Sequence, residues 1–568
     1  MRSLSVNSWL YALAAAAGWL APSLSMAAND VWKTAVNGTW SAGLNWVDGS
    51  TPSSIFDQAT FNLPGAYTVS FTGDPDPIGA LTLTSAANVT FASSSRPGNP
   101  IVPRSLSLVE TSGANNGNLV VSGGATLTLG ATTAGFPSSS HPFHLTAGGN
   151  LSVGPTATLN VRFGSDVVAS VLSHEGQINV SGSGSSLNVN SMHILGGSLN
   201  VTAGGLVQST SSFVGLDTGG GSVTVSGAGS QWNNSGRLTV GFDEGGSSML
   251  NVTGGGSVSS TDGVIGVANG AGTATVTGGA WTMTGRLSVG GDVSGELSDG
   301  TGTLSIQPAG TVSAVQGVVI FLQGLVRLQG GTLDASTVSF DGAGGQFQWA
   351  SGTLHVGTFN GSLTNSGGTL APGHSAGSTT INGNYTQVSE GVLEIEIAGP
   401  LAGSEFDFVN VTSTAQVNGE LDLTLTGGFV PTPSQTFAIL ISGGLSGAFD
   451  NAPSGQRVTT SDGGGSFLVN YGVGSPFDDN HVVLSNFLAG AGQSGDFDVD
   501  GDVDGRDFLI WQRGGSPNPL STGDLALWRA DFGAPAVAAG GAVPEPTTLV
   551  LICLSAVTIR RSRAPCFR

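Results

Sequence analysis

A step from valine or isoleucine to glycine returns at a nearly constant interval through the middle of this chain. It occurs at Val214-Gly215, Val240-Gly241, Ile265-Gly266 and Val289-Gly290, at intervals of 26, 25 and 24 residues. A second run of alternating apolar and small polar residues follows each step, as at 250–254. Such a period predicts an array in which each repeat is one supersecondary unit that stacks on the next.

The composition of the repeats favours strands over helices. The chain of 568 residues contains 92 glycines, and glycine costs about 1 kcal/mol relative to alanine inside a helix. A unit of about 25 residues holds two or three short strands with turns, which suits one coil of a solenoid. We therefore expect an all-β fold, a parallel β-helix or solenoid with coils of ~25 residues. The rival is a set of β-sandwiches with meandering antiparallel strands, which seldom repeat so evenly.

Other patterns divide the rest of the chain into regions. The expected regions are a signal peptide over 1–28, an N-terminal β cap region over 29–110, glycine-rich β-solenoid repeats over 111–392, a terminal β-region over 393–487, a small helical calcium-loop module over 495–533, a linker over 534–542 and a sorting tail with a short transmembrane segment over 543–568. Aromatic residues near the start, Trp32, Trp40, Trp46 and Phe61, are expected to cap the first coil, because solenoids need an atypical end.

One segment near residue 373 resembles a known family. Leu370 to Gly377, followed by Gly383-Asn384-Tyr385, is similar to the segment that often closes the autotransporter-type repeats of bacterial surface proteins. The same residues match the bare Gly-x-Ser-x-Gly pattern of a nucleophile elbow, which requires a helix directly after it. Residues 379–381 read as a strand instead, so we expect an ordinary turn here.

Both ends of the chain carry targeting patterns. Arg2 precedes an apolar run from Trp9 to Leu20, and small residues follow to Ala28. This order is typical of a secretory signal peptide, and the run is too short for a membrane anchor. At the other end, the motif Val543, Pro544, Glu545 and Pro546 precedes a mostly apolar stretch over 547–559 and an arginine cluster over 560–563.

The C-terminal elements together resemble the PEP-CTERM sorting signal of Gram-negative bacteria. The resemblance implies transient insertion of the tail in the inner membrane and handling by an exosortase, a sorting membrane protease. It also implies a final place at the cell surface, in the outer envelope or in the extracellular matrix, where extracellular polysaccharide is a possible partner. The alternative is a chance tail-anchor helix, although thirteen apolar residues fall short of the ~20 that span a bilayer.

The charge of the chain excludes one class of function. The net charge is −21, and several of the 16 basic residues lie in the two extreme ends. Nucleic-acid binding requires basic residues that replace phosphate counterions, so we expect none. Divalent cations are the more natural partners. The two cysteines, Cys553 and Cys566, lie in the tail, so the body is not built on disulfides.

An aspartate-rich segment before residue 508 has the spacing of a calcium loop. The candidate ligands fall at loop positions 1, 3, 5, 7, 9 and 12, and are Asp496, Asp498, Asp500, Asp502, Asp504 and Asp507. Gly501 stands at position 6, where the loop turns sharply. Calcium prefers six to eight oxygen ligands, and we expect Asp502 to contribute its backbone carbonyl and Asp507 to bind through both oxygens.

The last position of this loop is aspartate rather than the glutamate of an EF-hand, which resembles a dockerin module. A dockerin carries two such loops, and here only a second helix over 524–533 follows, so the module is degenerate. Gly505 and Arg506 stand where the family selects its partner with small hydroxyl residues, which makes a cohesin-like partner a weak expectation. The alternative is an acidic linker that binds calcium loosely.

No catalytic constellation is evident in the sequence. Glu394 and Glu396 point to one face of a strand and could meet the carboxylate separation of a glycosidase, although a solvated strand face is the preferred interpretation. Asp217, Asp243 and Asp292 recur after the glycine steps, as a metal ladder or as turn residues. We therefore expect an exported structural or adhesive repeat protein with a calcium module, not an enzyme. The alternative is a β-helix lyase or glycosidase, or a carbohydrate-binding scaffold.

Overall fold

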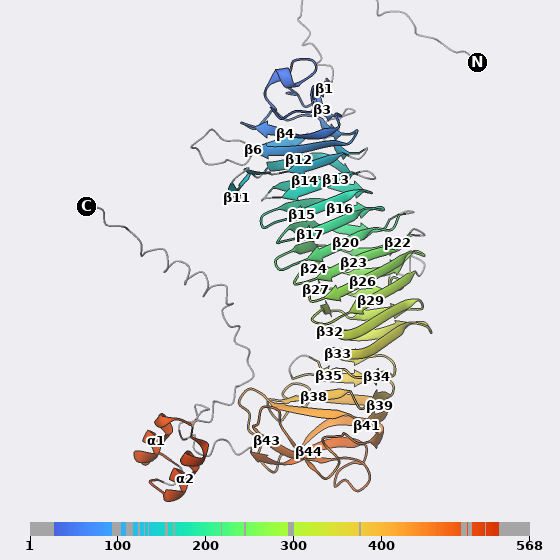
Figure 1. Ribbon diagram of the computed structural model, residues 1–568. Coiled ribbons are helices and arrows are strands. Elements are labelled where there is room, and N and C mark those ends of the chain that lie inside the picture. The colour runs from blue at the N-terminus through green and yellow to red at the C-terminus, as the bar shows by residue number, and fades with distance from the viewer. Residues whose placement is uncertain are drawn as a thin grey trace, which may run out of the picture. The chain divides into compact units, whose positions relative to one another are not determined.

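A computed structural model provides the fold of the chain. It describes residues 28–93, 104–108, 118–122, 125–129, 131–133, 136–141, 143–153, 157–162, 165–216, 219–243, 246–293, 300–373, 376–489, 497, 503–516 and 519–532. The chain divides into two compact units, unit 1 up to Ser235 and unit 2 from Gly236. Figure 1 shows strands stacked one above another within each unit.

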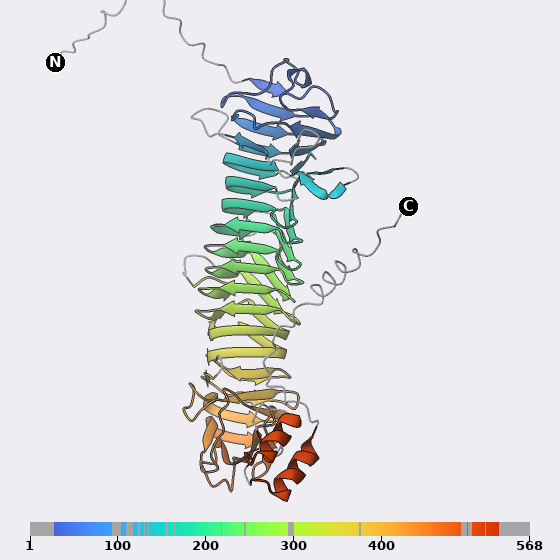
Figure 2. The same ribbon diagram turned by 90° about the vertical axis from the view of Figure 1, so that its left-hand side faces the viewer.

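Unit 1 is built from short strands that pair in parallel with strands further along the chain. The series used below comprises β9 (Thr126–Leu129), β13 (Thr158–Arg162), β15 (Gln177–Ser181), β17 (Ser198–Thr202) and β20 (Ser222–Ser226). Each member pairs in parallel with the next, so Thr158, Gln177, Ser198 and Ser222 fall in one column. One hairpin, β10 (Ala131–Thr133) with β11 (Phe136–His141), is antiparallel and stands beside the stack (Figure 2).

Unit 2 places the repeated glycine steps in register. The strands β22 (Leu238–Phe242), β25 (Gly263–Val267), β28 (Leu287–Val289) and β31 (Val318–Phe321) pair in parallel in that order. Val240 lies opposite Ile265, and Ile265 lies opposite Val289. The repeat found in the sequence is therefore a structural repeat within unit 2.

Glycine is required after each of these steps. Gly266 has φ +71°, in the left-handed region that side chains other than glycine rarely adopt. A Cβ atom at Gly266 would also collide with the backbone carbonyl of Thr301. The chain can therefore turn and pass close to its neighbour only with glycine at this position.

Strand residues alternate between a buried and an exposed face. In β26 (Ala271–Thr277) every second residue is buried, and the intervening threonines are half-buried. Two tryptophans extend this core, Trp232 in β21 (Gln231–Asn234) of unit 1 and Trp281 in β27 (Ala280–Met283) of unit 2. Each unit thus buries an apolar interior and presents a polar outer face.

Aromatic residues fill the N-terminal part of unit 1. Trp32 and Trp46 meet edge-to-face with ring centroids 5.1 Å apart, and Trp40 meets Trp46 at 5.0 Å. All three side chains are buried, and Phe61 packs against each of them. The aromatic residues singled out in the sequence therefore form one cluster. Their capping role remains a prediction.

The C-terminal part of unit 2 changes to antiparallel pairing. Its strands are β38 (Val392–Ile397), β39 (Phe408–Val417), β40 (Glu420–Leu425), β41 (Phe437–Gly447), β42 (Arg457–Thr459), β43 (Gly465–Asn470) and β44 (His481–Ala489). β38 and β40 are still parallel, whereas β44 pairs antiparallel with β41 and β43. Two helices follow, α1 (Gly505–Gln512) and α2 (Thr522–Asp531).

The predicted all-β class is confirmed, and most strand pairs are parallel. The two short helices also lie where the sequence predicts them. In the part of the chain that the structure describes, no helix has the length and apolar character needed to cross a membrane. The signal peptide over 1–28 falls almost entirely outside the described residues, and the sorting tail over 543–568, with its motif Val543 to Pro546, falls wholly outside them.

Candidate functional site

The described part of the predicted calcium loop is organised around Asp507. This residue is fully buried, and its two carboxylate oxygens accept hydrogen bonds from the backbone N–H groups of Phe497 (2.7 Å) and Asp504 (2.8 Å). Asp504 caps α1, since its carboxylate accepts from the N–H of Arg506 at 2.6 Å. The chain therefore folds back between residues 497 and 507, so that the start and end of the predicted loop meet.

Aromatic packing joins the two helices of the module. Phe508 of α1 contacts Trp528 of α2 with ring centroids 4.8 Å apart, and Trp528 contacts Phe532 at 4.7 Å. The indole N–H of Trp528 donates to the backbone carbonyl of Asp504 at 2.8 Å, and that of Trp511 donates to Ser521 at 3.0 Å. Trp528 thus packs on Phe508 and ties α2 to the end of the loop.

Four of the six predicted ligands, Asp496, Asp498, Asp500 and Asp502, lie outside the described residues. The remaining two, Asp504 and Asp507, are joined through the backbone contact described above. Among the side chains that the structure describes, no group of three or more His, Cys, Asp or Glu residues is placed to hold a metal ion. Calcium binding at the loop therefore remains a prediction.

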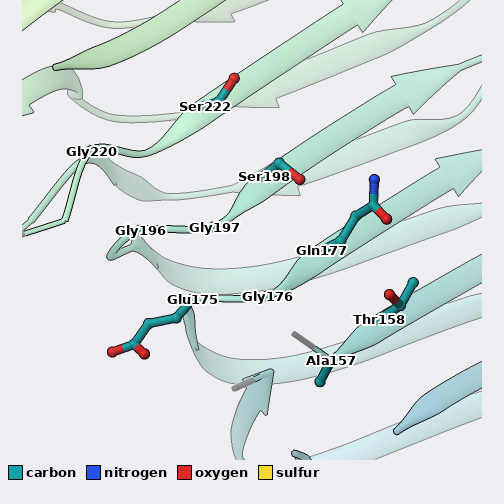
Figure 3. A pocket seen from close by; sticks show the side chains of 10 residues that line it. All are labelled: Ala157, Thr158, Glu175, Gly176, Gln177, Gly196, Gly197, Ser198, Gly220 and Ser222. Carbon is teal, nitrogen blue, oxygen red and sulfur yellow. The ribbon is translucent and has the colours of Figure 1, made fainter. Parts of the chain in front are cut away.

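Unit 1 carries a pocket of about 410 Å³ beside the turns that join its strands (Figure 3). Glycines form much of its lining, at positions Gly176, Gly196, Gly197 and Gly220. The column of Thr158, Gln177, Ser198 and Ser222 continues the lining along successive strands, and Glu175 is its one charged residue. Such a surface offers hydroxyl and amide groups but no reactive pair.

Beside this column runs a ladder of side-chain amides. Asn179 donates to Asn160 at 2.8 Å, and Asn200 donates to Asn179 at 2.9 Å. Asn160 in turn donates to Thr128 at 3.2 Å. Because parallel strands place equivalent residues side by side, the side-chain amide of one asparagine can donate a hydrogen bond to the amide oxygen of the next along the stack. The ladder stabilises the outer face of unit 1.

A second pocket, of about 340 Å³, lies in unit 2. It is lined by Arg237, Asp262, Gly263, Val264, Arg286, Ser288, Asp292, Val293 and Gln316. Arg237 and Asp292 form an ion pair at 2.8 Å. The sequence interpretation of Asp292 as a metal ligand or as a turn residue missed this partner. The recurrence of Gly-Arg-Leu at 236–238 and 285–287 is the signal that marks the pocket in the sequence.

Glu394 of the terminal β-region has a second acidic neighbour, Asp422, besides the predicted neighbour Glu396. Glu394 lies opposite Asp422 of the neighbouring parallel strand, in addition to sharing a strand face with Glu396. Burial raises the pKa of the Glu394 carboxyl, and the charges of Asp422 and Glu396 raise it further, while His355 opposes them. The sequence could place Glu396 beside Glu394, but it could not show Asp422.

Asp407 is the most deeply buried acid of this region, with 3% of its surface exposed. Its carboxylate accepts hydrogen bonds from the backbone N–H groups of Gly377 (2.6 Å) and Glu396 (2.8 Å). Burial raises the pKa of Asp407 to about 6, although these two hydrogen bonds oppose the rise. Asp407 therefore fastens β38 to the turn before β36 (Ser378–Ile381).

The segment around Gly373 is a turn between two strands. β35 (Thr369–Pro372) precedes it and the strand β36 follows it, where a nucleophile elbow would require a helix. Gly373 has φ +63°, as a tight turn requires. The prediction of a turn rather than a nucleophile elbow is confirmed.

No family model matches the chain, and no curated protein matches its sequence.

Proposed function

We propose that the protein is an exported structural or adhesive protein of the cell surface or extracellular matrix, and that its two units are parallel β-solenoids. The observation that carries the proposal is the in-register return of the chain in each unit. In unit 2, Leu238, Gly263, Leu287 and Val318 occupy one column on four successive parallel strands. A stack of this kind grows by repetition and presents a long polar outer face, which suits a scaffold or an adhesive surface.

The parallel pairing favours this reading over the antiparallel sandwiches that were the rival. A sandwich would pair strands that adjoin in sequence, whereas β22 pairs with β25, and β25 with β28. The intervals of 25 and 24 residues between the paired positions Leu238, Gly263 and Leu287 match the predicted length of a coil.

We further propose that the module over 495–533 binds one calcium ion. The hydrogen bond from Phe497 to Asp507 supports this, because Phe497 lies between the predicted ligands Asp496 and Asp498. It brings the second and last positions of the loop together, as expected for a loop that wraps around one ion. Each oxygen of Asp507 accepts one backbone N–H group, which holds this carboxylate at the end of the loop.

Titration calorimetry with calcium tests the module. We expect the wild-type protein to bind one ion and the Asp500→Ala variant to lose that site. Asp450→Ala, which removes an exposed aspartate of the terminal β-region, is the matched control and should bind as the wild type does. Equal binding by Asp500→Ala and wild type would refute the assignment.

The sorting tail supports export to the surface. We propose that an exosortase-like membrane protease recognises Val543, Pro544, Glu545 and Pro546, and that extracellular polysaccharide surrounds the released protein. Fractionation of cells that express the full chain, or the chain ending at Ala542, tests this step. The shortened chain should be exported but no longer retained in the envelope. Retention of both forms would contradict a role for the tail.

The pairing of Glu394 with Asp422 favours one second candidate, a glycoside hydrolase. Retaining hydrolases use two carboxyl groups about 5–5.5 Å apart, one of them with a raised pKa, and adjacent parallel strands place opposite residues at a similar spacing. Incubation with neutral and acidic polysaccharides, followed by a reducing-end assay, tests it. Release that disappears in Glu394→Gln would replace the structural proposal with an enzymatic one.

A further inference from the structure

Unit 2 gathers scarce positive charge in one pocket. Arg237 and Arg286 are the only arginines in the sequence between Arg162 and Arg327, and no lysine lies there, in a chain of net charge −21. Both line the pocket of about 340 Å³, a size within the range of small-ligand sites. Two arginines that lie 49 residues apart in sequence thus line the same pocket.

The strand register brings these arginines together. The N–H of Leu238 donates to the carbonyl of Asp262, and the N–H of Gly263 donates to the carbonyl of Arg286, both at 2.9 Å. The residues before β22, β25 and β28 therefore lie side by side as Arg237, Asp262 and Arg286. Positive, negative and positive side chains alternate along this column.

Arg237 is held in place and neutralised. Its guanidinium lies 2.8 Å from the carboxylate of Asp292, whose side chain is 3% exposed. The Nε of Arg237 is buried and has no hydrogen-bond partner among the described residues. The ion pair with the buried Asp292 leaves the half-buried Arg237 as a wall of the pocket that retains an unused donor.

Arg286 is the exposed cation of the pocket. Its backbone N–H donates to the carboxylate of Asp262 at 2.9 Å, which fixes the start of β28. Within the described ranges, the guanidinium of Arg286 makes no hydrogen bond or ion pair. Its five donors are therefore available to a ligand, in a fork that matches a carboxylate.

We infer that this pocket binds the carboxylate of an acidic sugar residue. Arg286 would hold the carboxylate, Gln316 and Asp262 would bond sugar hydroxyls, and the half-exposed Val293 would contact the ring. Asp292 offsets the charge of Arg237, so Arg286 is the one exposed cation of the pocket lining, and its planar fork matches the two oxygens of a carboxylate. This binding would make the proposed function more specific. It rests on that proposal in one respect, the presence of polysaccharide around the protein.

Calorimetry with trigalacturonate as the probe tests this inference on the purified full-length protein. EDTA in the buffer keeps the calcium module from contributing. We expect binding of trigalacturonate, and affinity at least about tenfold weaker for its methyl ester, which lacks the charge. Arg286→Gln should lower the affinity for the acid by about tenfold and leave the affinity for the ester unchanged.

Arg327→Gln is the matched control, because Arg327 lies in unit 2 outside the pocket and contacts Gln348 at 3.2 Å. It should bind as the wild type does. Arg237 is not the residue to change, since its loss leaves the buried Asp292 without its cation. Circular dichroism confirms that each variant is folded.

Three results would overturn the inference: no binding of trigalacturonate, equal binding of acid and ester, or equal binding by Arg286→Gln and wild type. Competition by inorganic phosphate at the same concentration as the sugar would overturn the choice of a carboxylate. None of these results bears on calcium binding or on sorting, so failure here is distinct from failure of the proposed function.

Discussion

Two buried tryptophans, Trp232 in unit 1 and Trp281 in unit 2, each have a hydrogen-bond partner for the indole N–H. The indole N–H of Trp281 donates to the hydroxyl of Ser260 at 3.2 Å, and that of Trp232 donates to Ser209 at 2.9 Å. Both tryptophans are fully buried, one in each unit. The serine on the neighbouring strand therefore makes burial of a large aromatic side chain compatible with its polar atom.

Removal of one of these hydroxyls gives the first prediction. Ser260→Ala leaves the N–H of Trp281 buried without a partner, and we expect unfolding free energy to fall by about 1–3 kcal/mol. Ser257→Ala, on the outward face of the same strand β24 (Ser257–Ser260), should change it by less than about 0.5 kcal/mol. Urea unfolding followed by tryptophan fluorescence measures both. Equal midpoints for the two variants would contradict the role of the hydrogen bond.

A buried acid near the N-terminus predicts pH-dependent stability. Asp30 is 2% exposed, and Asp48 and Asp57 are the charged groups near it. The pKa of the Asp30 carboxyl is raised from 3.8 to about 7, and burial is the largest cause. The hydrogen bond with Asp48 and the negative charges of Asp48 and Asp57 also raise it. The hydrogen bond with Asp30 in turn holds the pKa of Asp48 below its usual value, so the pair shares one proton.

The sign of the effect follows from linkage. Between about pH 4 and 7 the folded protein keeps a proton on Asp30 that the unfolded chain has lost, so stability falls as pH rises through this range. Asp30→Asn should flatten this part of the profile and stabilise unit 1 above pH 7. Thermal unfolding of wild type and variant at several pH values, monitored by the fluorescence of the nearby tryptophans, checks it. Parallel profiles would show that Asp30 does not titrate in this range.

Turns of the array depend on glycine for two separable reasons. Gly266 has a positive φ and faces the carbonyl of Thr301, whereas Gly342 has φ +84° with open space around it. Gly342→Ala should therefore cost only the conformational strain, about 1–2 kcal/mol. Gly266→Ala should cost clearly more, because β25 must also move away from its neighbour. Chemical unfolding of both variants measures the difference, and equal losses would show that the turn relaxes without cost.

Periodicity in the sequence predicted those features that depend on local repetition. The glycine steps at Val240, Ile265 and Val289 predicted the repeat that the structure shows as parallel strands in register, and the helix predicted over 524–533 corresponds to α2. Asp507 was singled out from ligand spacing, and the structure brings it next to Phe497. The strand and helix predictions held because strand alternation and helical spacing are written directly in neighbouring residues, whereas calcium binding at Asp507 remains a prediction.

Side-chain contacts between paired strands were not predictable in the same way. The ion pair of Arg237 with Asp292 and the pairing of Glu394 with Asp422 depend on how many residues each turn contains. The interval between paired strands is 25 residues from Leu238 to Gly263 but 31 from Leu287 to Val318. A shift of one residue would turn every side chain to the opposite face, so the sequence alone did not fix these partners.

Excess negative charge acts on the whole molecule. With 37 acidic and 16 basic residues, the chain has a net charge of −21 at pH 7 and an isoelectric point near 4.4. Repulsion among these charges destabilises the compact state, and salt screens it over about 10 Å at 0.1 M. Monovalent salt should therefore stabilise the body generally by screening this repulsion. Calcium at low concentration should act only through the module.

We therefore expect the unfolding temperature at pH 7 to rise with sodium chloride between about 0.01 M and 0.15 M, because the screening length shortens over this range. The same salt series near pH 4.4 should have little effect, since the net charge there is close to zero. Calorimetric scans of wild type and Asp500→Ala separate this general effect from calcium binding, because both proteins should respond alike to sodium chloride. A salt response that persists at pH 4.4 would show that screening of net charge is not its cause.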